Sequence, residues 1–294
     1  MNANESKKPV LVAVQGDQPA LVHYAADEAR RRRTKLVVLH VYGVVHADVG
    51  VVATTISSPR DDAKAQEVLD RAKDVVDGMD EAPPTRYLAE LGSVIGKIEE
   101  HVTHAQLLVI GADEISWFDR VLGGAIARHL AEHAACPVVV VPPHHDLSVL
   151  YGGVCVAIDD DAHAAGPLRF AFEEASARES TLIVLHVVPE GLKRPEAEAE
   201  RVSVAEVLAG WRDEFPDVVV TTRMVFDDEV ASAAARASEE SELLVVGRPR
   251  RRFMAVHAVA SRLTDSAHCP LAVVEGSYGV AARSAGSVDT ARAR

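Results

Sequence analysis

The chain contains one segment twice. Residues 107–141 begin with LLVIG and end with CPVVVV, and residues 243–274 begin with LLVVG and end with CPLAVV. Each copy opens with a short aliphatic run that stops at a glycine, which is typical of a buried parallel strand ending at a turn. The duplication predicts that the chain consists of two copies of one folding unit.

A helix is expected after the loop in each copy, because apolar residues recur there at helical spacing. These residues are Ile126, Leu130 and Ala134 in the first copy and Val259, Leu263 and Ala267 in the second. A Cys-Pro pair ends each helix, since proline disfavours helical geometry in the residue before it. A second buried strand follows the proline, so the segment is a βαβ crossover.

The earlier part of each copy repeats as well. Strands are predicted at Val10–Val14 and Leu36–Val41, with counterparts at Val154–Ile158 and Leu182–Val187. With the helices between them, each copy has the pattern βαβαβαβαβ, which predicts a five-stranded parallel sheet with helices on both faces. We expect one domain at residues 1–147, a second at 148–276 and a disordered tail, rich in Ala, Ser and Gly, at 277–294.

Two local features of the first copy carry specific expectations. Ser58 before Pro59, with acidic residues in the next turn, predicts a helix start, whereas no element is predicted for residues 44–57. The run Arg30 to Arg33 closes the first helix, and we interpret it as a solvated basic face that complements the helix dipole.

Composition excludes some classes of function. The formal net charge of −13 argues against a nucleic-acid partner, because such binding requires a basic surface. No apolar run approaches the roughly 20 residues that span a bilayer, and the polar N-terminus lacks a signal-peptide core. We therefore expect a cytoplasmic protein without a membrane partner. Cys136, Cys155 and Cys269 lack CxxC spacing, which favours small buried thiols.

The ordered motifs resemble one family along nearly the whole chain. VLVAVQGD or VCVAIDDD at the first strand, LVVLHV or LIVLHV at the second, LLVIG or LLVVG at the fourth and a final CPVVVV or CPLAVV look like tandem universal stress proteins. The resemblance implies two Rossmann-like domains and a stress-response protein that binds or regulates and is not an enzyme. It also implies that the last strands, Val138–Val141 and Leu271–Val274, pair to form an internal pseudo-dimer, and a homodimer of chains is plausible.

Nucleotide-binding members of the family resemble one another in a loop G-x-x-G-x9-G-[ST] and an aspartate after the first strand. The first copy places Gly111, Glu114, Gly124 and Ala125 at the four loop positions and Gln15 at the aspartate position. Glu114 would bring a carboxylate close to a phosphate. Two negative charges about 4 Å apart repel each other by roughly 4 kcal/mol at an effective dielectric of about 20. We therefore predict that the first copy does not bind ATP with useful affinity.

The second copy departs from the same pattern differently. Asp159 and Gly247 match, but Arg250 replaces the second glycine, His257-Ala258 replaces the final pair, and the loop is shorter. Ligands of such sheets bind beyond the carboxyl ends of the strands. The nucleotide-binding candidates are therefore Asp159, Val187, Gly247, Arg248, Arg250, Val41, Gly111 and Gly124.

The arginines of this loop leave two interpretations open. They could bind ATP or another phosphorylated ligand through side chains, or they could be a solvated basic loop. No cofactor is certain, and ATP is a possibility that favours the second domain.

A hydrolase is the alternative from another class. His129, Glu132 and His133 spell H-x-x-E-H, an inverted zinc-protease motif in which two histidines hold the metal. These residues lie toward the C-terminal end of their predicted helix, away from the edge where ligands bind. The motif is short enough to arise by chance, so a binding module remains the favoured function.

Overall fold

The computed structural model describes most of the chain. The described residues are 7–46, 54–56, 58–112, 125–143, 152–158, 164–191, 193–248, 259–260, 262–264 and 266–279. Everything stated below about structure concerns these residues.

Domain 1 alternates strands and helices as its sequence pattern predicts. Its elements are β1 (Val10–Val14), α1 (Pro19–Arg31), β2 (Leu36–Tyr42), β3 (Val44–His46), β4 (Thr54–Ile56), α2 (Pro59–Asp77), β5 (Thr85–Leu91), α3 (Val94–Val102), β6 (Leu107–Gly111), α5 (Ala125–His133) and β7 (Val138–Val141). The antiparallel pair β3 and β4 falls in the stretch for which the sequence predicted no element.

Domain 2 repeats the plan. Its elements are β8 (Val154–Ile158), α6 (Ala165–Ala177), β9 (Leu182–Val188), α7 (Arg194–Glu214), β10 (Val220–Phe226), α8 (Val230–Ser238), β11 (Leu243–Gly247) and β12 (Leu271–Val274). Helical residues also occur between β11 and β12, at 259–260, 262–264 and 266.

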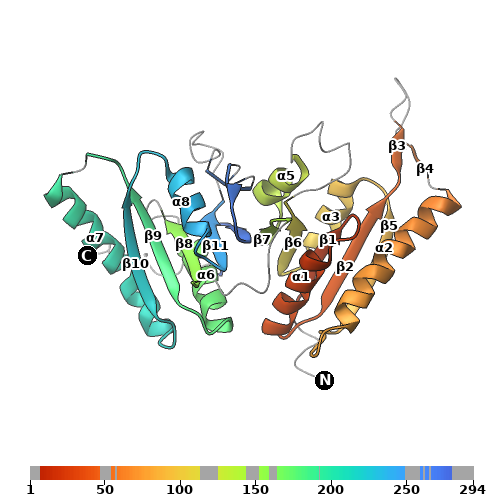
Figure 1. The fold of residues 1–294 in the computed structure, drawn as a ribbon, viewed down its shortest axis with the longest axis horizontal. Coiled ribbons are helices and arrows are strands. Elements are labelled where there is room, and N and C mark those ends of the chain that lie inside the picture. Colours follow the sequence, from red (N-terminus) through yellow and green to blue (C-terminus); the bar gives the residue numbers. More distant parts are fainter. Residues whose placement is uncertain are drawn as a thin grey trace, which may run out of the picture.

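The two domains share one ten-stranded sheet, in the order β10-β9-β8-β11-β12-β7-β6-β1-β2-β5. Neighbouring strands within each domain are parallel, and the domains join where β12 pairs with β7 in antiparallel register, with Ala272 opposite Val139. Figure 1 shows the halves side by side about this junction. The pairing confirms the expected internal pseudo-dimer and leaves no exposed edge at the join.

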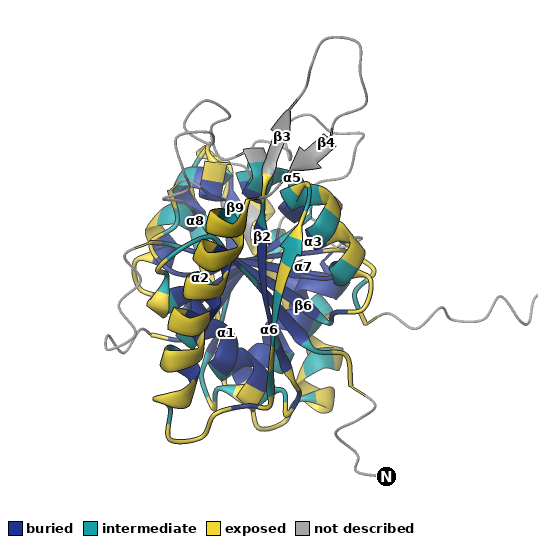
Figure 2. Ribbon diagram, turned by 90° about the vertical axis from the view of Figure 1, so that its right-hand side faces the viewer, coloured by how far each residue is buried: buried dark blue, intermediate teal, exposed yellow. Residues whose placement is uncertain are grey.

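Helices cover both faces of the sheet. On one face α1, α2, α6 and α7 pack over a core that runs across both domains, with members such as Leu69, Phe172 and Leu208. The other face has a core under α3 and α5 and another that includes α8. The strands lie buried between these layers, while the outer side of α2 is exposed (Figure 2). Because helices cover both faces of the sheet, its strands are apolar on both faces.

Local signals account for individual elements. The Ser58 side chain accepts from the Asp61 backbone amide and the Asp61 carboxylate accepts from the Ser58 amide, which is the capping box that starts α2. The three cysteines are free and buried as expected. Burial raises the pKa of Cys136 and Cys155 to about 11 and that of Cys269 to about 12.

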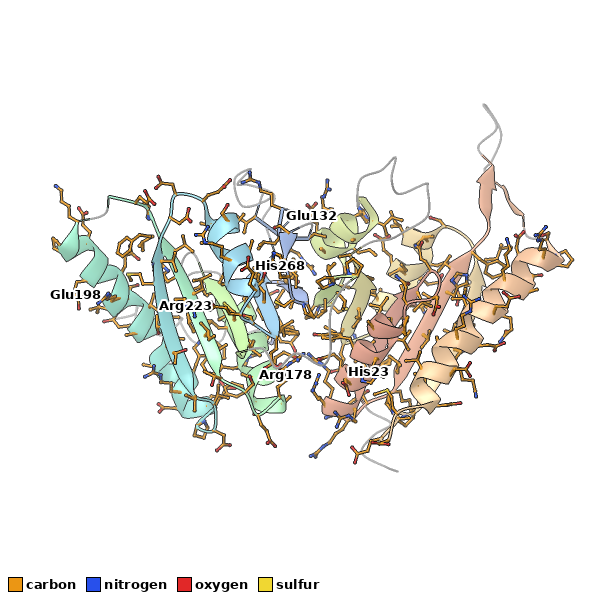
Figure 3. All side chains as sticks on the ribbon, in the orientation of Figure 1. His23, Glu132, Arg178, Glu198, Arg223 and His268 are labelled. Atoms are coloured by element: carbon orange, nitrogen blue, oxygen red, sulfur yellow. The ribbon has the colours of Figure 1, made fainter. Side chains whose placement is uncertain are left out.

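A buried charge cluster joins the ends of α1 and α6 across the pseudo-twofold axis. At the C-terminal end of each helix an arginine bonds the glutamate four residues earlier, Arg32 to Glu28 and Arg178 to Glu174. Each arginine also reaches into the other domain, Arg32 to Glu174 and Arg178 to Glu28. Arg178 is labelled at this junction in Figure 3.

Aromatic rings complete the cluster. The guanidinium carbon of Arg32 lies 5.3 Å from the Phe170 ring centroid, and that of Arg178 lies 5.8 Å from the Tyr24 centroid. The side chains of Arg32 and Arg178 are only 12% and 5% exposed. The solvated-face interpretation of Arg30 to Arg33 is therefore wrong for Arg32, because its partner is a carboxylate of the other domain.

Two charges of each sign make this cluster neutral, which lowers the cost of burying it. Burial alone would raise the pKa of Glu28, but the guanidiniums of Arg178 and Arg32 hold it below its usual range. Burial and the neighbouring Glu28 charge raise the pKa of Glu174.

Among the described residues no helix has both the length and the apolar character needed to cross a bilayer.

Candidate functional site

A pocket opens at the carboxyl edge of the domain 1 sheet. Val14 and Gln15 at the end of β1, Val41 on β2 and Gly111 on β6 line its floor. Helices α3 and α5 form its walls with side chains that include Ile98 and Ile126. This is the edge where ligands of open parallel sheets bind.

The pocket is small. Its volume is about 30 Å³, which suffices for on the order of two water molecules. The empty space in and around it, open solvent included, is about 460 Å³.

Two glutamines shape the polar side of the pocket. The Gln15 backbone amide donates to the Gln18 side-chain oxygen over 3.0 Å, which turns the chain from β1 into α1. A Cβ added at Gly111 would lie 3.0 Å from the Gln18 amide nitrogen. Glycine at 111 therefore allows the Gln18 side chain to lie over the end of β6.

The described lining of this pocket carries no charged side chain; it consists of Ala, Val, Leu, Ile, Gly and Gln residues. Gln15 stands at the position where the family pattern has an aspartate. Such a surface favours an apolar, planar group with a few hydrogen-bonding atoms, and it offers no countercharge to a phosphate.

The corresponding edge of domain 2 is partly covered by the chain itself. After β12, the carbonyl of Gly276 accepts from the Gly166 amide in the first turn of α6 over 3.1 Å. A Cβ at Gly166 would lie 2.1 Å from the Glu275 carbonyl oxygen, so only glycine permits this contact. Tyr278 then packs edge-on against Phe170 and donates to Glu173 over 2.8 Å.

Arg248, the first residue after β11, binds domain 1. Its Nη1 donates to the Ala134 carbonyl over 2.7 Å and its Nη2 to the Cys136 carbonyl over 3.0 Å. Both carbonyls lie just beyond the C-terminal end of α5, where a positive charge is favourable. The guanidinium is thus engaged in a contact between domains. Burial lowers the pKa of Arg248.

The structure brings together only some of the residues that the sequence proposed. Val41 and Gly111 line the domain 1 pocket, together with Gln15. Val187 is half-buried on β9, and Gly247 ends β11. The remaining candidates, Gly124, Asp159 and Arg250, lie outside the described residues, as do Glu114 and His257-Ala258.

The pocket also contains residues that sequence reasoning missed. No role was predicted for Gln18, although a polar side chain directly before Pro19 is a signal of a helix start at the ligand edge. Val94 and Ile98 of α3 line the pocket as well, and nothing but their place in the topology could have indicated that.

The matched histidines of β2 and β9 are buried at equivalent places but are bonded differently. His40 Nδ1 lies 2.9 Å from the Val14 carbonyl, and burial lowers the pKa of His40. His186 Nε2 lies 3.0 Å from a Glu200 oxygen, and its Nδ1 is buried without a hydrogen-bond partner. These contacts tie strands to their surroundings, which indicates that both residues have a role in the fold.

The residues of the H-x-x-E-H motif lie on α5 (Figure 3 labels Glu132). His129 Nε2 is 3.0 Å from a Glu99 oxygen, and His133 Nδ1 is 2.9 Å from the His129 carbonyl. The two imidazole rings stack with centroids 4.5 Å apart. Within the described part of the chain, no three His, Cys, Asp or Glu side chains are placed to hold a metal ion.

Comparison with known proteins places this geometry in a family. The model of the universal stress protein family matches residues 7–142 and 151–275. Universal stress protein Rv2623 of Mycobacterium tuberculosis is 29% identical, with 94% of this chain and 99% of that protein covered. A universal stress protein of Mycolicibacterium smegmatis is also 29% identical, with coverages of 90% and 96%.

Solved structures agree on the fold. A universal stress protein from Archaeoglobus fulgidus superposes with a TM-score of 0.64 at 16% identity, covering 91% of this chain and 96% of the other. One from Pseudomonas aeruginosa gives a TM-score of 0.59 at 16% identity, with coverages of 93% and 95%. With a family domain matched in each half, the chain belongs to the universal stress protein family.

Proposed function

We propose that this protein acts by binding rather than by catalysis, and that its ligand site is the domain 1 pocket. The ligand class is an adenine nucleoside or nucleotide, recognised through its base and ribose with little contribution from the phosphates. The observation that carries the proposal is the pocket at the carboxyl ends of β1, β2 and β6, whose described lining is uncharged.

The lining supports a binding role. Apolar side chains from α3 and α5 suit the faces of a purine, while Gln15 and the backbone at the strand ends supply hydrogen-bonding groups. The described lining has no titratable side chain that could act as acid, base or nucleophile. Nucleotide-binding members of the family make an adenine ligand the natural candidate.

The choice of domain 1 differs from the sequence-based expectation, which favoured domain 2. Two observations support the change. The first turn of α6 already bonds the Gly276 carbonyl, and the Arg248 guanidinium already bonds two carbonyls of domain 1. A phosphate in domain 2 would have to compete with both contacts. Loss of strong phosphate recognition agrees with the departures from the glycine pattern in both copies.

Calorimetric titration of the full chain with adenosine, AMP and Mg-ATP tests the ligand class. We expect the three dissociation constants to agree within about tenfold, or 1.4 kcal/mol, because the described lining offers the phosphates no cation. ATP binding more than a hundredfold tighter than adenosine would show a phosphate site and refute the proposal. Failure of all three to bind would refute it too, and release of ADP or phosphate from ATP would refute the non-enzymatic role.

A further inference from the structure

Helix α5 belongs to both domains at once. Its residues Ala127 and Leu130 are buried in the domain 1 core beneath the pocket. The next residue, Ala131, is 3% exposed and belongs to the domain 2 core, together with Ala260 and Leu263. In Figure 1, α5 lies close to the junction of the two halves. One helix therefore has a face in each core.

The two ends of α5 meet the ligand edges of the two sheets. Toward its N-terminal end, Ile126, Ala127 and Leu130 line the domain 1 pocket. Just past its C-terminal end, the carbonyls of Ala134 and Cys136 accept from Arg248 over 2.7 and 3.0 Å. Arg248 directly follows Gly247, the carboxyl end of β11, and its own amide donates to the Val274 carbonyl over 2.7 Å.

Among the residues that the structure describes, this connection exists in one direction only. Ala112 makes the equivalent backbone bond in domain 1, donating to the Val141 carbonyl over 2.8 Å. Alanine has no side chain that could reach the other domain. The Arg248 contact is therefore an addition to the repeated plan. In it, a half-buried guanidinium of domain 2 holds the end of a domain 1 helix.

We propose that α5 couples the domain 1 pocket to the carboxyl edge of the domain 2 sheet, with Arg248 as the positioning residue. A shift of α5 that accommodates a ligand moves the Ala134 and Cys136 carbonyls against a planar guanidinium that is fixed by two hydrogen bonds. The Arg248 backbone bond carries that movement to β12. Linkage makes the coupling reciprocal. If a ligand in the pocket shifts an equilibrium at the domain 2 edge by some factor, then shifting that equilibrium changes the pocket affinity by the same factor. The inference rests on the proposed function for its ligand and adds regulation to it.

Methyl NMR of the full chain tests the coupling without a ligand. Three isoleucines, Ile98, Ile110 and Ile126, line the pocket, so their δ1 methyl signals report on its shape. Ile126 is about eight residues, or about 12 Å along the helix, from Ala134. We expect Arg248→Gln to shift the pocket signals. Arg248→Lys should shift them less and in the same direction, because lysine keeps the charge but not the bidentate geometry.

Arg223→Gln is the matched control. Arg223 is also a domain 2 arginine with a two-nitrogen contact, to Glu240 over 3.1 Å, but it lies on β10. Arg223→Gln should leave the methyl signals of the pocket isoleucines unchanged. Pocket signals that stay unchanged in both Arg248 variants would overturn the proposal and leave Arg248 as a local clamp. If Arg248→Gln does not fold, the lysine variant decides.

Titration of the same variants separates this proposal from the proposed function. If the wild type binds adenosine, Arg248→Gln should change its affinity by about fivefold or more, the lower end of typical coupling. Unchanged affinity would refute coupling and leave the binding role intact. If the wild type binds no adenosine, the binding role fails while the methyl shifts still decide whether the two edges are coupled.

Discussion

The two domains are alike at the base of the sheet and different at its carboxyl edge. At the base, Glu28 and Arg32 of α1 match Glu174 and Arg178 of α6, and each arginine bonds both glutamates. Both helices end the same way, with a residue of positive φ after the arginine, Arg33 at 50° and Glu179 at 54°. This conformation ends a helix.

At the carboxyl edge the match fails. Domain 1 has a pocket behind Gln15 and Gly111, while in domain 2 the chain after β12 bonds the first turn of α6 and Arg248 reaches into domain 1. The comparison teaches that the contacts that hold the halves together are duplicated, whereas the carboxyl edge, where we propose that the ligand binds, has diverged.

The largest expected effect comes from breaking the duplicated cluster. Arg178→Met leaves Glu28 and Glu174 short of a buried countercharge, and such losses cost about 3 to 5 kcal/mol. Chemical denaturation of the full chain should show a decrease of that order in the free energy of unfolding. Arg32→Met should cost less, because Arg32 is 12% exposed and Arg178 only 5%. Equal stability of wild type and Arg178→Met would contradict the role given to the cluster.

A smaller effect is expected where the domains differ. Gly166→Ala puts a Cβ 2.1 Å from the Glu275 carbonyl oxygen, so the segment after β12 must move. Such overpacking costs about 1 to 3 kcal/mol. Limited proteolysis should then cut near Tyr278 sooner than in the wild type.

Gly210→Ala is the control for that substitution. Gly210 lies within α7 with nothing within 4 Å of its added Cβ, so alanine should stabilise by about 0.5 to 1 kcal/mol through helix propensity. If both glycine substitutions stabilise the protein, the C-terminal segment does not cover α6 in solution.

The smallest effect concerns pH. Burial lowers the pKa of His40 in the folded state, so the unfolded chain binds the proton more readily. The stability that neutral His40 provides is present above its unfolded pKa of about 6.5 and is lost as pH falls from there toward the lower folded value. His40→Gln should reduce the loss of stability between pH 7 and 5 and keep a donor for the Val14 carbonyl. If the free energy of unfolding of His40→Gln depends on pH as that of the wild type does, this role of His40 is refuted.

Much of the fold could be predicted from the sequence because repetition and strand patterning are local signals. The helix start at Ser58 and the pairing of the last strands were both confirmed. The role of Arg32 could not be predicted, because its partner Glu174 is distant in sequence and comes near only when the domains join. A run of arginines at a helix end looks solvated until that partner is placed.

The site was predictable only in part, for a similar reason. Val41 and Gly111 follow from the rule that ligands bind at strand ends, and both line the pocket. Arg248 suggested an anion site because its loop is basic, yet its guanidinium bonds carbonyls of the other domain. The direction of a long side chain depends on neighbours that a one-dimensional pattern does not identify.

The most direct test of the account compares the same substitution in both domains. Ala13 on β1 lines the pocket, and Ala157 holds the equivalent place on β8 with similar burial. Valine suits a strand at either position, and at 13 its methyls enter the pocket. AMP titrated against both variants should bind Ala157→Val as it binds the wild type and should bind Ala13→Val at least about tenfold more weakly. Loss of binding in Ala157→Val alone would place the site in domain 2 and contradict the account.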